Sequence, residues 1–401
     1  MEQQIFRAAI LASYGATESE IEELLIYNQN IFEHDNWQPS LKFPLEPEPH
    51  IVTWEEYAVT AKEIGVFETL KQVFVQLSFP IQEGISQTEI YRAATLKGVN
   101  LDGISEATGL VLEQPEKLDL KIYQSLAGAI PVILPGNRED FVSLVRSLIK
   151  RNEPQPLPAS MGACMVAGYN NWDRIRRYRQ QWERENPANC SETDWKDEFA
   201  RLIPQKSRYQ DRFIILSDGF YSNVSANDIG LSESEWRHLS LKIRLEHECT
   251  HYFTHRLFHS MQNNLLDELI ADYRGIVAAT GRYRADWFLR FMGLESLANY
   301  RESGRLQNYR GQPTLSDGAF KILQALVTDA ALNLERFDAE YIDDLNIGNE
   351  RLLLSIALTY LTLEELASQK VTSRLLAILE QLQTESTELG VRSTDAINRV
   401  Y

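Results

Sequence analysis

Hydrophobic and polar positions repeat along the chain with two different periods. The segment 17–32 has the 3.6-residue period of an amphipathic helix, whereas AIPVILPG at 129–136 is a proline-bounded apolar run typical of a strand. RFIILSDGFYS at 212–222 is a second strand-like run, and it ends in turn residues. These patterns predict a mixed α/β region in the first part of the chain.

The last third of the chain has the helical period almost throughout. A long helix is expected to begin at Ser232, because the sequence SESEW places Glu235 three residues after this N-cap. Nothing breaks this helix before about Met261. Further helices are expected at 267–280, 316–334, 349–368 and 371–384. The predicted fold class is therefore α+β, with a mixed α/β N-terminal region and a mostly helical C-terminal half.

A proline-rich segment at 152–158, NEPQPLP, divides these two parts. Its prolines cannot continue the preceding helix and favour extended backbone. We therefore expect one domain at 1–151, for which substrate selection is one option, and a second domain at 159–401 that carries the long helix and the helical C-terminal part.

The long helix contains the most informative motif of the chain. The sequence LEHECTHYF places His247, Glu248 and His251 as H-E-x-x-H. Residues four apart lie about 6 Å apart along a helix and about 40° apart around it, so both imidazoles can bind one zinc ion. Glu248 is rotated by about 100° from His247, which keeps it off the metal but beside the same cleft. A general base for water would be needed at that place.

A catalytic zinc ion needs a third protein ligand and an open position for water. The next predicted helix offers Asp267, Glu268 and Asp272, and their residue types leave open which of them contacts the metal. Glu268 and Asp272 are four residues apart on one face of that helix. One carboxylate could therefore bind zinc while the other accepts the outer N–H of a ligating histidine.

Taken together, HECTH and DELIAD resemble the gluzincin arrangement of thermolysin-like zinc metallopeptidases, in which H-E-x-x-H is followed on a second helix by E-x-x-x-D. The resemblance is confined to these two segments, and it implies a zincin-like active-site helix. It implies that His247, His251 and Glu268 bind Zn²⁺. It also implies that Glu248 is the general base and that Asp272 orients His247 from outside the ligand set.

Further side chains near the motif could act on the substrate or the transition state. His255 lies about 12 Å along the helix from His247, which is too far for both to share one small ion with His251. His255 and His259 could instead contact the substrate. Donors to a developing oxyanion could come from the following residues, none of which the resemblance assigns: Tyr252, Tyr273, Arg274 and His259.

Charge and composition narrow the choice of partners. The net charge is -17, and the acidic residues are spread along the chain, which argues against a nucleic-acid partner. Three widely spaced cysteines predict no disulfide framework, and neither a signal peptide nor an apolar run long enough to span a bilayer is evident. We expect a cytoplasmic protein with a peptide or protein substrate and no membrane partner, and its oligomeric state stays open.

The sequence thus predicts a zinc-dependent hydrolase that cleaves peptide bonds, as a selective cytosolic endopeptidase or a processing protease. Two alternatives remain. One is a regulatory peptidase acting on a repressor, since the H-E-x-x-H and later E-x-x-A-D signature of the ImmA/IrrE group is also similar to HECTH and DELIAD, although no helix-turn-helix is evident. The other is a non-catalytic interaction protein with a structural zinc site.

Overall fold

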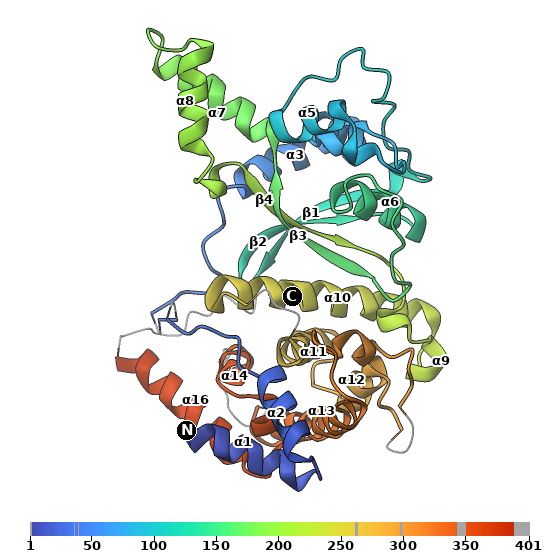
Figure 1. Ribbon diagram of the computed structural model, residues 1–401, viewed down its shortest axis with the longest axis vertical. Helices are drawn as coiled ribbons and strands as arrows, with labels where there is room; N and C mark the ends of the chain where they lie inside the picture. Colours follow the sequence, from blue (N-terminus) through green and yellow to red (C-terminus); the bar gives the residue numbers. More distant parts are fainter. Residues whose placement is uncertain are drawn as a thin grey trace. The chain divides into compact units, whose positions relative to one another are not determined.

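The computed structural model of the protein describes residues 2–35, 37–38, 40–260, 264–296, 300–342 and 350–388. The chain forms two compact units, both seen in Figure 1. Glu46–Gly219 is called the sheet unit here, and Met1–Leu45 together with Phe220–Tyr401 is called the helical unit. The α+β class predicted from the sequence is confirmed, because the chain combines many helices with one small sheet.

The sheet unit is built on a four-stranded sheet with the order β1-β2-β4-β3. Its strands are β1 (Asp119–Ser125), β2 (Gly128–Leu134), β3 (Ala163–Asn170) and β4 (Gln210–Leu216). The β1–β2 hairpin is antiparallel, β2 pairs with β4 in parallel, and β3 is antiparallel to β4. The predicted strands at 129–136 and 212–222 correspond to β2 and β4, whereas β1 and β3 were not specifically expected.

The predicted domain boundary at 152–158 falls inside this sheet unit. Strands from before and after the proline-rich segment pair with each other, since β2 lies beside β4 in one sheet. The helix before this segment already ends at Leu148, and the proline-rich segment leads into β3 without separating two folding units. The units of the structure differ from the predicted 1–151 and 159–401 for this reason.

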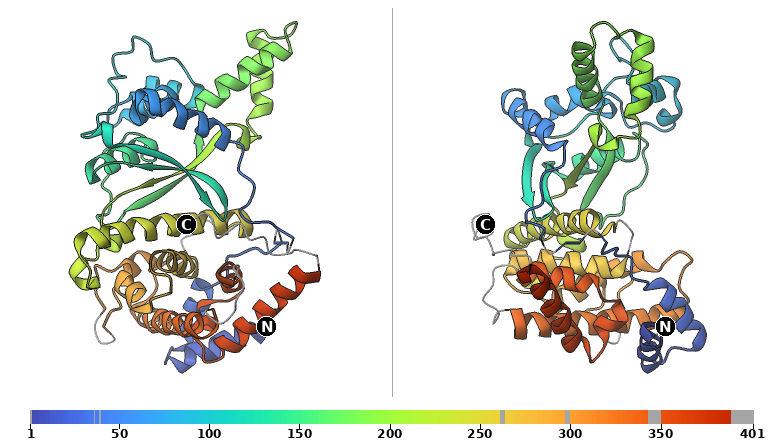
Figure 2. Two further views of the ribbon diagram at one scale, coloured as in Figure 1. Left: turned by 180° about the vertical axis from the view of Figure 1, so that it is seen from behind. Right: turned by 90° about the vertical axis from the view of Figure 1, so that its left-hand side faces the viewer.

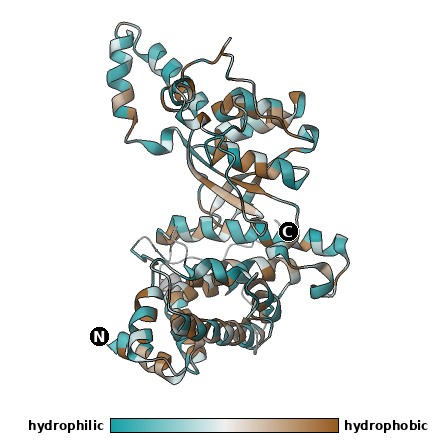
Figure 3. Cartoon of the chain, turned by 45° about the vertical axis from the view of Figure 1, so that its right-hand side comes forward, coloured by the Kyte–Doolittle hydropathy of each residue, from teal (hydrophilic) through white to brown (hydrophobic). Residues whose placement is uncertain are grey.

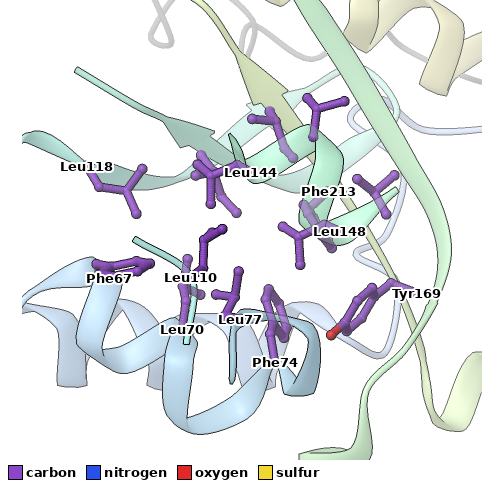
Figure 4. Close-up of a cluster of buried hydrophobic side chains, with 14 of the residues drawn as sticks. Phe67, Leu70, Phe74, Leu77, Leu110, Leu118, Leu144, Leu148, Tyr169 and Phe213 are labelled. Carbon is purple, nitrogen blue, oxygen red and sulfur yellow. The ribbon is translucent and has the colours of Figure 1, made fainter. Parts of the chain in front are cut away.

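The sheet unit also contains six α-helices, and its hydrophobic core combines residues of helices and strands. The helices are α3 (Ile51–Ile64), α4 (Val66–Val73), α5 (Glu89–Lys97), α6 (Arg138–Leu148), α7 (Trp172–Glu185) and α8 (Glu192–Leu202). Figure 4 shows Leu70 of α4 and Phe74, which directly follows α4, facing Leu144 of α6 and Phe213 of β4. Phe74 and Phe213 stack with ring centroids 5.5 Å apart, and both are fully buried. Such apolar burial is the main stabilising contribution to this unit.

A buried polar network crosses the sheet unit beside this core. The carboxylate of Asp211 on β4 accepts hydrogen bonds from Trp54 Nε1 at 2.9 Å and from Asn171 Nδ2 at 2.7 Å. It also forms an ion pair with Arg174 Nη1 at 2.6 Å. Asp211 is 1% exposed. A carboxylate this deeply buried is stable because it is both paired and hydrogen-bonded.

The helical unit contains the remaining helices, in which hydrophilic and hydrophobic residues alternate (Figure 3). They are α1 (Glu2–Ser13), α2 (Glu18–Tyr27), α9 (Ala226–Ile229), α10 (Glu233–Phe258), α11 (Leu265–Thr280), α12 (Ala285–Met292), α13 (Asp317–Phe337), α14 (Glu350–Thr359), α15 (Leu363–Ala367) and α16 (Val371–Glu388). Within the described ranges, none of the helices has both the length and the apolar character of a membrane span.

The N-terminal helices belong to this helical unit although the rest of the unit follows residue 219. Arg7 of α1 forms a buried ion pair with Glu364 of α15 at 3.1 Å. The same arginine donates to the backbone carbonyl of Asn28, whose side chain in turn donates to Glu364 at 3.0 Å. These contacts join the two ends of the chain, which a division by sequence position could not predict.

Most predicted helices of this unit occur close to their expected positions. The helices predicted at 17–32, 267–280, 316–334 and 371–384 correspond to α2, α11, α13 and α16. The predicted helix at 349–368 is instead two helices, and its first position lies outside the described residues. The chain breaks it because Thr362 begins α15 with its own capping box, in which its side chain and that of Glu365 bond reciprocally.

The long helix α10 begins as predicted, with Ser232 and Glu235 forming a capping box. It ends at Phe258, where His259 adopts a left-handed conformation with φ 54°. The expected end at Met261 lies outside the described residues. Figure 2 shows α10 running across α11, and the two helices approach closely at Gly275, where a Cβ would lie 2.7 Å from the carbonyl oxygen of Ile243. This approach allows side chains of the two helices to meet.

Candidate metal centre

Three side chains from α10 and α11 bring their donor atoms to one point. His247 Nε2 lies 3.1 Å from His251 Nε2. Glu268 places Oε2 3.5 Å from His247 Nε2 and Oε1 3.4 Å from His251 Nε2. His247, His251 and Glu268 therefore form a group that could hold a metal ion. Glu248 follows His247 on α10 and is partly exposed.

The spacing of these donors fits tetrahedral zinc. Zinc binds histidine nitrogen and carboxylate oxygen at about 2.0–2.2 Å, so neighbouring donors of a regular tetrahedron lie about 3.3–3.6 Å apart. The three separations in the structure, 3.1, 3.4 and 3.5 Å, lie in or close to this range. A set of two imidazoles and one carboxylate is also a common donor set of catalytic zinc.

The outer nitrogens of both histidines contact carboxylates. Asp272 Oδ1 lies 2.8 Å from His247 Nδ1, which is the position that the gluzincin resemblance implies for it. Asp267 Oδ2 lies 3.1 Å from His251 Nδ1. A proton on each Nδ1 completes these hydrogen bonds and leaves both Nε2 atoms, which face Glu268, available to a metal ion when the imidazoles are neutral. Of the three acids that the sequence left open, Glu268 alone faces both Nε2 atoms.

The charged side chains of this cluster favour the binding of a cation. Asp267, Glu268 and Asp272 carry three negative charges, and Arg305 beside them carries one positive charge, which leaves -2 when both imidazoles are neutral. Asp272 is fully buried, and the side chain of Glu268 is only 12% exposed. In the metal-free protein a proton on His251 can offset only part of this buried charge, whereas a divalent ion would neutralise all of it.

In the metal-free protein, the charged neighbours within this cluster also shift the pKa values of Glu268, Asp272 and His251. Burial alone would raise the pKa of Glu268, but His251, His247 and Arg305 hold it far below its usual range. Burial likewise opposes the ionised form of Asp272, yet Arg305 and His247 lower its pKa. Burial disfavours the charged form of His251, while Asp267 and Glu268 raise its pKa well above the ordinary value. The carboxylates thus stay ionised and attract positive charge to the Nε2 side.

Tyr221 was not predicted from the sequence and lies at the outer side of His247. It belongs to the short helix η5 (Tyr221–Asn223), and its backbone N–H donates to Ser240 of α10. Its hydroxyl donates to Asp272 Oδ1 at 2.5 Å and lies 2.9 Å from His247 Nδ1. Arg244, which stands one turn before the motif, places its guanidinium 5.6 Å from the Tyr221 ring centroid. This buried arginine therefore packs behind the cluster.

Arg305 and Tyr309 also reach the cluster from another short helix, η6 (Arg305–Tyr309). Arg305 forms ion pairs with Asp272 and with Glu268. Burial together with the nearby Glu268 charge raises the pKa of the Tyr309 hydroxyl well above the ordinary value. No motif in RLQNY signals these roles, because the contact depends on how η6 folds back onto α11.

The other predicted site residues have different surroundings. Tyr273 is fully buried, and its hydroxyl donates to Asp338 at 2.7 Å, so this donor is already in use. Tyr252 is buried with the guanidinium of Arg256 5.7 Å from its ring centroid. His255 and Arg274 are partly buried, and His259 is exposed at the end of α10. The contacts to the cluster come instead from Tyr221, Arg305 and Tyr309.

Replacing Asp272 with asparagine is expected to weaken zinc binding about 10- to 100-fold, the usual effect of losing a carboxylate behind a ligating histidine. The variant loses the negative charge that fixes the tautomer of His247 and attracts the ion. Competition with a chromophoric chelator measures the affinity. Asp338→Asn is the matched control, because Asp338 also accepts from a buried tyrosine but touches Tyr273 rather than a histidine. Equal zinc affinity in the Asp272 variant and the wild type would contradict this expectation.

The fold and the cluster together define an α+β protein with a three-donor group between two packed helices that could hold a metal ion. The chain belongs to a family of unknown function, DUF7005, whose family model matches residues 9–370. This match spans most of both units and includes every residue of the cluster. No curated protein and no solved structure matches the chain.

Proposed function

We propose that the protein is a zinc-dependent metallopeptidase of the gluzincin type. One observation carries this proposal: His247, His251 and Glu268 converge at separations suited to tetrahedral zinc while the outer nitrogen of each histidine faces a carboxylate. The choice of peptides as substrates rests on the resemblance of HECTH and DELIAD to that group.

The number of ligands favours a catalytic site over a structural one. Structural zinc sites usually have four protein ligands, whereas catalytic sites have three and keep one position open. In the described part of the chain, the cluster consists of three such residues, and no fourth histidine, cysteine or carboxylate joins them. This count argues against the non-catalytic alternative with a structural zinc ion.

The residues of the chain divide the chemistry among them. When bound, zinc supplies the Lewis acidity that polarises a carbonyl and lowers the pKa of water. Glu248 takes the proton from the attacking water and returns it to the leaving nitrogen. Asp267 and Asp272 keep the two imidazoles oriented. We assign the donor to a developing oxyanion to Tyr309, which lies near Glu268.

We further propose a selective role, as a cytosolic endopeptidase or a processing protease, with the sheet unit contributing to the choice of substrate. The test is metal analysis of the purified protein combined with a broad peptide library. We expect one zinc ion per chain, cleavage by the zinc-loaded protein and loss of cleavage after chelation. A fully zinc-loaded protein that cleaves no peptide would favour the structural-site alternative, and a protein that binds no zinc would refute the proposal.

A further inference from the structure

Arg305 lies among the carboxylates of the metal centre rather than at its edge. We propose that Arg305 is a built-in counter-cation, which holds Glu268 and Asp272 in place in the metal-free protein and thereby limits the affinity for a divalent ion. This inference rests on the metal site of the proposed function, but it concerns metal binding and does not require hydrolysis. It makes Arg305 a positioning residue.

The contacts of Arg305 all point inward. Its Nη2 pairs with Asp272 Oδ2 and lies 3.6 Å from Glu268 Oε2. Its Nη1 donates to the Tyr221 hydroxyl at 2.9 Å and lies 3.4 Å from Ser222 Oγ. The guanidinium of Arg305 therefore contacts Glu268, which is a proposed zinc ligand. It also contacts Asp272, which lies behind the ligand His247, and the Tyr221 hydroxyl, which is hydrogen-bonded to the same Asp272 carboxylate.

The burial of Arg305 indicates that its charge matters more than its hydrogen bonds. Its side chain is only 13% exposed. Its Nε is buried and has no hydrogen-bond partner among the described residues. Leaving such an atom unsatisfied is unfavourable, so the ion pairs of Nη2 and the hydrogen bonds of Nη1 must offset that penalty. An arginine cannot release its proton in a protein, and its charge is therefore permanent.

This permanent charge changes the net charge of the cluster to which a metal ion would bind. Without Arg305, Asp267, Glu268 and Asp272 would give the cluster a charge of -3, and with it the charge is -2. A divalent ion then brings the cluster to neutrality. The same ion is repelled by the guanidinium, because both positive charges contact Glu268. At the effective dielectric constant of a protein site, repulsion over a few ångströms corresponds to about tenfold or more in affinity.

Removing the charge should leave the donor geometry largely intact. Asp272 is also held by His247 Nδ1 at 2.8 Å and by the Tyr221 hydroxyl at 2.5 Å. Glu268 is fixed by its position on α11, which packs tightly against α10 at Gly275. When the Arg305 charge is removed, the metal-free protein loses the only arginine–carboxylate pairs among the described residues of the cluster. The metal-bound protein instead loses the repulsion between the guanidinium and the metal ion.

The test measures zinc affinity by chelator competition in the full chain, without substrate. Arg305→Met is expected to bind zinc about tenfold or more tightly than the wild type, because the repulsion is gone. Arg305→Lys keeps the charge and is expected to stay within about threefold of the wild type. Arg310→Met is the matched control, since Arg310 follows η6 but pairs with Asp317, and its zinc affinity should not change.

A second readout is thermal stability. Metal-free Arg305→Met should melt below the wild type, and zinc should raise its melting temperature by more than it raises that of the wild type. If Arg305→Met does not fold without metal, the comparison moves to the Asp272→Asn background. There, position 272 carries no charge, so Arg305→Met removes the repulsion without leaving a buried carboxylate unpaired at that position. Zinc should again bind about tenfold more tightly than to Asp272→Asn alone.

Zinc affinity that is unchanged or weaker in Arg305→Met would overturn the inference, as would a tenfold gain in Arg305→Lys. Absence of binding of both Zn²⁺ and Co²⁺ to the wild type would contradict it together with the metal site. Tighter zinc binding in Arg305→Met by a protein that cleaves no peptide would support the inference while removing the proposed peptidase activity. The two proposals can therefore fail separately.

Discussion

Glu248→Gln is expected to keep one zinc ion per chain while lowering kcat about 10²- to 10⁴-fold. Glutamine has the size of glutamate but cannot accept the proton of the attacking water. Because His247, His251 and Glu268 form the donor set without Glu248, metal binding should not depend on this side chain. Metal analysis and peptide hydrolysis of the same preparation measure both quantities.

The matched control is Glu233→Gln, the same substitution at an exposed position in the first turn of α10. It should change neither zinc content nor hydrolysis. Loss of zinc from Glu248→Gln would mean that Glu248 is a ligand rather than a base. Full activity of a zinc-loaded Glu248→Gln variant would exclude Glu248 as the general base of the reaction.

Asp211→Ala is expected to lower the free energy of unfolding of the sheet unit by about 3–5 kcal/mol. The substitution leaves the guanidinium of Arg174 buried without its carboxylate, and the side chains of Trp54 and Asn171 lose an acceptor. Urea denaturation followed by tryptophan fluorescence measures the loss. Asp197→Ala is the control, because Asp197 is exposed on α8 and its removal should cost little.

The double variant Asp211→Ala with Arg174→Met separates the charge from the packing. If the unpaired arginine causes most of the loss, the double variant should be more stable than Asp211→Ala alone. If the double variant is instead less stable than the wild type by the sum of the losses in the two single variants, the effect is due to packing. In either case, zinc affinity should be unchanged, since the network lies in the sheet unit and the metal centre in the helical unit.

The division of the chain into units depended on contacts that no local pattern contains. The prolines of 152–158 correctly predicted that the preceding helix does not continue, but the pairing of β2 with β4 joins the strands on either side of them. The first helices looked like part of an N-terminal domain. They belong to the helical unit because Arg7 pairs with Glu364, which lies 357 residues further along the chain. Local sequence predicts where elements begin and end, and long-range pairing decides how they are grouped.

The sequence alone determined the helices that carry the candidate site and the set of residues able to form it. The capping box at Ser232, the helical period and the four-residue spacing of His247 and His251 are local properties, because a helix fixes the relative directions of its own side chains. The same geometry placed Glu268 and Asp272 on one face of α11.

Only the tertiary structure decided which acid faces both Nε2 atoms and which residues complete the cluster. Glu268 faces them, and Asp267 takes the outer nitrogen of His251, because of the angle and close approach between α10 and α11. Tyr221 stands 26 residues before His247, and Arg305 stands 33 residues after Asp272. Periodicity within a helix cannot specify such contacts, since they depend on how separate elements pack against one another.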